Sequence, residues 1–95
     1  MTTEPEYGLL ASRSLPDARM LGVEPLTYGA ARLCIGPENG QWWEDFWDYG
    51  TAAEALVAFR KWDPAQAAEP SGWVRHAPSG RRRLRGDPAN EEVRP

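Results

Sequence analysis

WWEDFWDYGTAAE, residues 42–54, carries the clearest strand signal and the clearest helix signal in this 95-residue chain. Its first eight residues include five aromatic side chains, and bulky aromatic residues prefer the pleated, half-buried surface of a sheet. We therefore expect a central strand over residues 42–49, in which adjacent Trp42 and Trp43 point to opposite faces. The same rings also fit one face of a helix, but Gly50 and a helix cap follow at once, which favours the strand.

The helix cap is Thr51-Ala52-Ala53-Glu54, which has the pattern of a capping box. The hydroxyl of Thr51 can accept a hydrogen bond from the backbone N–H of Glu54, while the Glu54 carboxylate reaches back to the N–H of Thr51. Apolar side chains then recur at helical spacing until Asp63-Pro64, where the residue before proline resists the helical conformation. The pattern predicts a helix over residues 52–62.

An apolar stretch over residues 26–35 precedes the aromatic run and predicts one or two strands. Asn39-Gly40 lies between the two and favours the tight turn of a hairpin, because both positions of such a turn need positive φ. A strict two-residue turn would place the apolar Ile35 opposite the charged Glu44. We therefore expect a bulge or a longer loop that shifts the register.

These elements predict an α+β fold, with a small antiparallel sheet of about three to five strands and one helix packed on a face. Residues 1–25 contain three prolines and no sustained period, so we expect an irregular N-terminal segment. The single domain should cover residues 26–86, and residues 87–95 should form a loose C-terminal tail. The expected core is Leu33, Ile35, Phe46, Trp47, Leu56, Phe59, Trp62, Val74 and Leu84.

Size and composition exclude several classes of protein. A chain of 95 residues is too short for a two-domain enzyme. The single cysteine and the single histidine, Cys34 and His76, form no internal disulfide and no metal cluster, so we expect no metal and no cofactor. The start of the chain lacks the features of a secretory signal and no apolar run can cross a bilayer, so we expect a cytoplasmic protein with no membrane partner.

Charge is segregated along the chain, whose net charge is -3. Residues 38–72 carry seven acids and two bases, whereas residues 73–86 carry five arginines and no acid. Such asymmetry in a short chain indicates either an internal seam of salt bridges or a charged face kept for a partner.

The arginines lie in an expected hairpin whose turn is Pro78-Ser79-Gly80. A three-residue loop places Ala77 opposite Arg81, and alternation outward from this pair separates two surfaces. One surface carries Val74, His76, Arg82 and Leu84. The other surface is the candidate partner-binding site and carries Trp73, Arg75, Arg81, Arg83 and Arg85.

Clustered arginines beside an indole are typical of sites for carboxylates or phosphates, because guanidinium groups form bidentate pairs and the ring offers a stacking surface. Alternatively, the arginines cover the acidic strand and pair with Glu44, Asp45 and Asp48. The aromatic strand supplies at least half of its rings to the core, and its exposed part is a second candidate patch. That patch comprises Trp42, Trp43, Glu44 and Asp45.

Neither His76 nor Cys34 lies in a recognisable catalytic motif. Catalysis would need a base within hydrogen-bond reach of the nucleophile and a third group to orient it. We therefore expect structural roles for both residues and no catalytic residues.

The C-terminal half contains the motifs Gly72-Trp73-Val74-Arg75-His76, Gly80-Arg81-Arg82-Arg83 and Gly86-Asp87. Together with the aromatic strand and the capped helix, they resemble a group of short proteins encoded in bacteriophages and prophages. The resemblance covers residues 41–95 and implies a phage or prophage origin, without a mechanism.

We therefore expect a small non-enzymatic interaction protein that binds an acidic partner protein through the arginine hairpin. One alternative is a nucleic-acid-binding accessory protein that uses the same residues on phosphates, although the negative net charge argues against it. Another is a small hydrolase with an unrecognised site. A homo-oligomer that covers Trp42 or Trp43 is a further alternative.

Overall fold

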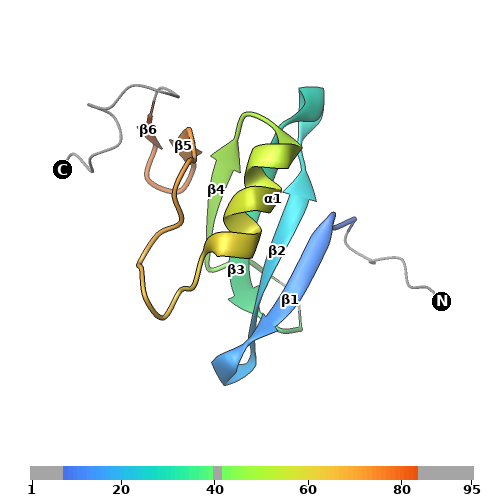
Figure 1. The fold of residues 1–95 in the computed structure, drawn as a ribbon, viewed down its shortest axis with the longest axis vertical. Helices are drawn as coiled ribbons and strands as arrows, with labels where there is room; N and C mark the ends of the chain where they lie inside the picture. Colours follow the sequence, from blue (N-terminus) through green and yellow to red (C-terminus); the bar gives the residue numbers. More distant parts are fainter. Residues whose placement is uncertain (1–7, 40–41, 84–95) are drawn as a thin grey trace.

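The computed structural model describes residues 8–39 and 42–83, which form a six-stranded antiparallel sheet with one α-helix on one face (Figure 1). The expected α+β class is confirmed, with more strands than expected. Neighbouring strands in the sheet are also consecutive in the chain. The elements are β1 (Ala11–Leu15), β2 (Arg19–Pro25), β3 (Ala31–Pro37), β4 (Asp45–Tyr49), α1 (Ala52–Lys61), β5 (Arg75–His76) and β6 (Arg81–Arg82), with short 3-10 turns at Pro16–Ala18 and Thr27–Gly29.

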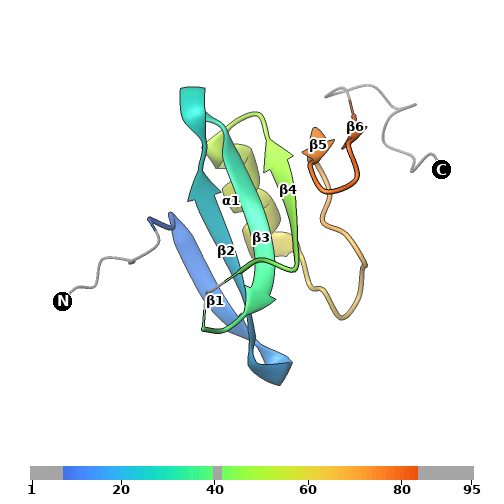
Figure 2. The same cartoon turned by 180° about the vertical axis from the view of Figure 1, so that it is seen from behind.

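The helix begins where the capping pattern predicts. The backbone N–H of Glu54 donates to the Thr51 hydroxyl at 3.1 Å, and the helix ends at Lys61, one residue earlier than expected. In Figure 1, α1 lies across the front of β2, β3 and β4. We call the opposite side of the sheet, seen in Figure 2, the open face.

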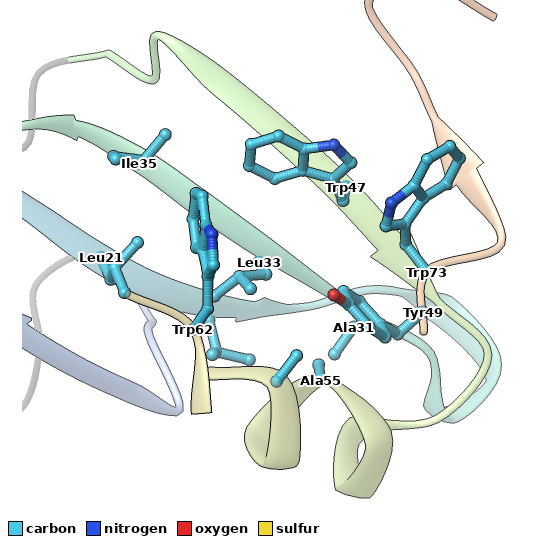
Figure 3. Close-up of a cluster of buried hydrophobic side chains, with 11 residues drawn as sticks. Leu21, Ala31, Leu33, Ile35, Trp47, Tyr49, Ala55, Trp62 and Trp73 are labelled. Carbon is cyan, nitrogen blue, oxygen red and sulfur yellow. The ribbon is translucent and has the colours of Figure 1, made fainter. Parts of the chain in front are cut away.

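The core lies between α1 and the sheet (Figure 3). It confirms four of the expected core residues, Leu33, Ile35, Trp47 and Trp62. Leu56 and Phe59 are partly buried and pack against it, whereas Phe46 lies on the open face and Leu84 lies outside the described residues. The core also contains buried residues outside the expected list, namely Leu21, Val23, Ala31, Tyr49, Ala55, Ala58 and Trp73.

The expectation of an irregular N-terminal segment is wrong for the part of it that the structure describes, because β1 and β2 occupy most of it. Pro16 opens the turn between these strands and Pro25 is the last residue of β2, so neither proline interrupts the strand interior. The sheet therefore begins at Ala11 and not near residue 26. The expected tail at residues 87–95 lies outside the described residues.

The connection between β3 and β4 is longer than a tight turn. Ile35 pairs with Asp45 and Leu33 pairs with Trp47, which confirms the expected shift of register away from Glu44. The strand starts only at Asp45, so the expectation that Trp42 and Trp43 alternate within a strand is wrong.

The part of this connection that directly precedes β4, residues 42–44, crosses the open face (Figure 2). The Trp43 ring lies over two glycines of the sheet, since a Cβ added to Gly22 or Gly36 would come within 3.1 Å of it. The Trp43 indole N–H donates to the Glu24 carboxylate at 3.0 Å.

The hairpin of β5 and β6 has a register that differs by one residue from the expected one. His76 pairs with Arg81 and Arg75 pairs with Arg82, so the loop contains four residues, 77–80. His76 closes this loop itself, because its carbonyl oxygen accepts the N–H groups of Ser79 and Gly80. The expected pairing of Ala77 with Arg81 is therefore wrong.

In the described part of the chain, no helix is long and apolar enough to span a membrane. Residues 8–39 and 42–83 contain no group of three His, Cys, Asp or Glu side chains that could hold a metal ion.

Candidate functional site

A line of charged residues crosses the open face at right angles to the strands. The strand registers align one residue from each of five strands, β2 to β6. Directly paired residues point to the same side of an antiparallel sheet, so these side chains share the open face. We call this line the charged row, and it comprises Glu24, Arg32, Asp48, Arg75 and Arg82.

Asp48 is the centre of the row and is only 8% exposed. Arg32 donates to it twice, from Nε to Oδ1 at 2.6 Å and from Nη2 to Oδ2 at 3.3 Å. This hydrogen-bonded carboxylate raises the pKa of Arg32, although burial alone would lower it. The guanidinium of Arg32 also lies 4.6 Å from the centre of the Phe46 ring, in a cation–π contact on the same face.

The positive charges of Arg75 and Arg82 are only partly neutralised by the carboxylates of the charged row. The two residues lie directly opposite each other, an arrangement that is destabilising for like charges. Arg75 reaches Asp48 Oδ2 at 3.5 Å, but that carboxylate already accepts the closer hydrogen bonds of Arg32. Arg82 is exposed, and among the described residues it has no hydrogen bond or ion pair. This end of the row can therefore accept a further carboxylate.

The arginines expected beside Arg75 lie on the other side of the sheet. The guanidinium groups of Arg81 and Arg83 lie 5.1 and 4.5 Å from the centre of the Trp73 ring. Trp73 itself is 3% exposed and belongs to the core, so it offers little outer surface. The single surface predicted for the hairpin is therefore divided, and its last member, Arg85, lies outside the described residues.

Glu69 holds Arg81 in place. Arg81 donates from Nη1 to Oε1 of Glu69 at 3.4 Å and from Nη2 to Oε2. Burial alone would raise the pKa of Glu69, but its hydrogen bonds and charge interaction with Arg81 outweigh burial and lower the pKa. Self-pairing of the arginines was a prediction of the sequence, but Glu69 was not among the expected partners, because it lies in the connection between α1 and β5 without a recognisable motif.

The second candidate patch is also divided. Trp42 is 57% exposed, whereas Trp43 covers the two glycines of the open face. On the helix side, Glu44 forms an ion pair with Arg19 at 2.9 Å. The Asp45 carboxylate lies 2.6 Å from Nε2 of His76.

A chain of hydrogen bonds joins Asp45, His76 and Ser79, with 2.7 Å between Nδ1 of His76 and the Ser79 hydroxyl. The order of groups is that of a Ser-His-Asp triad. However, the hydroxyl also accepts the backbone N–H and the Nε–H of Arg81, at 3.2 and 3.1 Å. The N–H groups of Ser79 and Gly80 donate to the His76 carbonyl, so none of these donors faces an incoming oxyanion. The arrangement holds the turn in its four-residue form.

Cys34 is fully buried in β3, and its thiol lies 3.7 Å from the carbonyl oxygen of Arg32. Burial raises the pKa of the Cys34 thiol, so little thiolate forms at neutral pH. This environment fits the structural role expected for Cys34.

No family model, curated protein or solved structure matches the chain.

Proposed function

We propose that the protein is a small non-enzymatic interaction protein that binds an acidic partner protein through its open face. The pair Arg75 and Arg82 is the centre of the site. One observation carries the proposal: the hairpin register pairs these two arginines directly with each other, beside a carboxylate that Arg32 already occupies. A carboxylate from a partner would relieve their repulsion and form charge-assisted hydrogen bonds with both.

Aromatic side chains near the row support binding of a protein. Phe46 is partly exposed under Arg32, and the exposed Trp42 belongs to the connection that crosses the same face. Protein interfaces are enriched in aromatic residues and arginine, which supply contact area and directional hydrogen bonds.

The charges on this face favour a protein partner over a nucleic acid. The row contains Glu24 and Asp48 between or beside its arginines, and the net charge of the chain is -3. A phosphate backbone is uniformly negative and would be repelled by both carboxylates, whereas a protein surface can present both signs. The proposed phage or prophage origin rests on the sequence resemblance alone.

The proposal is tested by titrating the protein with a short poly-L-glutamate peptide at low salt and following the backbone amide signals by NMR. We expect the largest shifts at Arg75, Arg82 and their neighbours. Replacing both residues, Arg75→Ala with Arg82→Ala, should weaken binding by about tenfold or more, equivalent to about 1.4 kcal/mol.

The matched control is the double variant Arg60→Ala with Lys61→Ala, which removes the same charge from the exposed end of α1. Equal weakening by both double variants would show that only net charge matters and would contradict the site. A single-stranded oligonucleotide is the second probe. Tighter binding of the oligonucleotide than of the peptide, lost in the Arg75 and Arg82 variant, would favour the nucleic-acid alternative instead.

A further inference from the structure

We propose that the acidic partner is a second copy of this chain, packed face to face through the open face about a two-fold axis parallel to the strands. This inference rests on the proposed function, because it uses the same site. It identifies the carboxylate that reaches Arg75 and Arg82 as Glu24 of the second copy.

The proposal follows from the order of signs in the charged row. From β2 to β5 the row reads Glu24, Arg32, Asp48 and Arg75, which alternates negative and positive. A two-fold axis parallel to the strands reverses this order in the second copy and leaves the row at the same height along the strands. If the axis runs between β3 and β4, Glu24 faces Arg75 of the second copy and Arg32 faces its Asp48. Every facing pair in these four strands is then opposite in charge.

Two other face-to-face arrangements bring like charges together. If the two-fold axis instead runs along the row, each charged residue faces the same residue of the second copy. An axis over β4 places Asp48 over Asp48 and Arg32 over Arg75. Like charges that face each other across an interface disfavour these arrangements, and the axis between β3 and β4 is the one that gives all four charges of β2 to β5 an opposite charge to face.

The same axis also places an aromatic ring in the interface. In the adjoining line of the open face, Cys34 of β3 pairs with Phe46 of β4. Cys34 is fully buried and offers no surface, so reversal of the strand order places the half-buried Phe46 ring over β3 of the second copy. The Trp43 ring, which lies over Gly22 and Gly36 on the same face, is then also part of the interface.

The second copy also supplies what the Arg75 and Arg82 pair lacks. In this arrangement, Glu24 of the second copy faces Arg75 on β5, and Arg82 is the next residue of the row, on β6. A carboxylate thus arrives beside the two guanidinium groups that repel each other. Because the interface is isologous, the same contact forms twice.

Sedimentation equilibrium of two charge-reversal variants tests the arrangement. Glu24→Arg places positive charges face to face with Arg75, and Arg75→Glu places negative charges face to face with Glu24. We expect the wild type to dimerise at low salt and each variant alone to be monomeric. An equimolar mixture of the two variants should restore a dimer, because each facing pair is again opposite in charge. Arg60→Glu, on the exposed end of α1, is the control and should dimerise like the wild type.

Restoration in the mixture separates the proposal from simple loss of folding, since two unfolded variants would not recover a dimer of wild-type mass. Circular dichroism of each variant checks the fold, because Glu24 also accepts a hydrogen bond from Trp43.

A wild type that stays monomeric at about 1 mM would overturn the inference. A mixture that stays monomeric, or single variants that still dimerise, would overturn this geometry. If the wild type is monomeric but binds poly-L-glutamate through Arg75 and Arg82, the proposed function stands without the second copy.

Discussion

Gly36 shows how one residue shapes the open face. A Cβ at this position would lie 2.5 Å from the carbonyl oxygen of Trp42 and 3.1 Å from Cα of Trp43. The connection before β4 approaches the sheet closely here, and only a residue without a side chain permits it. The position therefore fixes where the Trp43 ring rests.

We expect Gly36→Ala to destabilise the protein by about 1–3 kcal/mol, because backbone atoms must move to admit the new methyl group. Urea unfolding measures this change. Gly22→Ala is the comparison, since its Cβ would meet only the ends of the Leu9 and Trp43 side chains, at 3.1 Å. A loss at Gly36 no greater than the loss at Gly22 would contradict the close backbone approach.

Single residues were predicted well where local chemistry determines them. Thr51 could be identified as a cap from four consecutive residues, and Cys34 could be assigned to the interior from its apolar neighbours. Trp73 could not be assigned to the interior in this way, because its burial depends on the guanidinium groups of Arg81 and Arg83, which stack over its ring. The partner of His76 is Asp45, which is distant in the sequence, so no local pattern reveals it.

At the level of elements, the hairpin of β5 and β6 has the largest effect on the candidate site. Its loop is one residue longer than the sequence suggested, and this moves Arg82 to the side of Arg75 while Arg81 goes to the helix side. The difference arises because Ser79 bonds to the His76 ring, and its N–H bonds to the His76 carbonyl, which closes the turn around His76. The sequence showed that a turn exists but not which residue closes it.

A double-mutant cycle tests the contact that fixes this hairpin to β4. His76→Ala and Asp45→Ala should each destabilise the protein by about 1–3 kcal/mol, because each removes the hydrogen bond between Nε2 of His76 and the Asp45 carboxylate. The double variant should cost less than the sum of the two, and thermal or urea unfolding supplies all four values. Additive losses would show that the 2.6 Å contact contributes no coupling.

Strands β1 and β2 illustrate a different limit of prediction. The alternation of Leu21 and Val23 toward the core was present in the sequence, but the neighbouring prolines and Gly22 concealed it. Gly22 lies in the middle of a strand because Leu9 and Trp43 pack directly against it. A glycine that would weaken an isolated strand is therefore required by its tertiary contacts.

At the level of the whole molecule, the connection between α1 and β5 is fastened at several points along its length. The Trp62 indole N–H donates to the carbonyl of Ala67, and the Tyr49 hydroxyl donates to that of Ser71. Between them, Glu69 forms its ion pair with Arg81. These contacts attach the hairpin and the connection to the remainder of the sheet.

The Glu69 contact should make stability depend on pH. Because the folded state lowers the pKa of Glu69, the ion pair stabilises the protein above the ordinary carboxylate pKa, and this contribution is lost as the pH falls through the lowered value. Glu69→Gln should therefore be less stable than the wild type at about pH 7, and the difference should shrink at about pH 3. Urea unfolding at both pH values is the measurement, and a difference that is constant or grows on acidification would contradict the ion pair.

The order of strands has a consequence for folding kinetics. Each strand adds next to its predecessor in the chain, so most pairings close short loops and contact order stays low for a sheet protein. Pairing of β4 with β5 closes a longer loop, because α1 and the connection after it lie between these two strands in the chain. The hairpins of β2, β3 and β4 should therefore form a folding nucleus early. The hairpin of β5 and β6, which carries the arginines, should pair with β4 last.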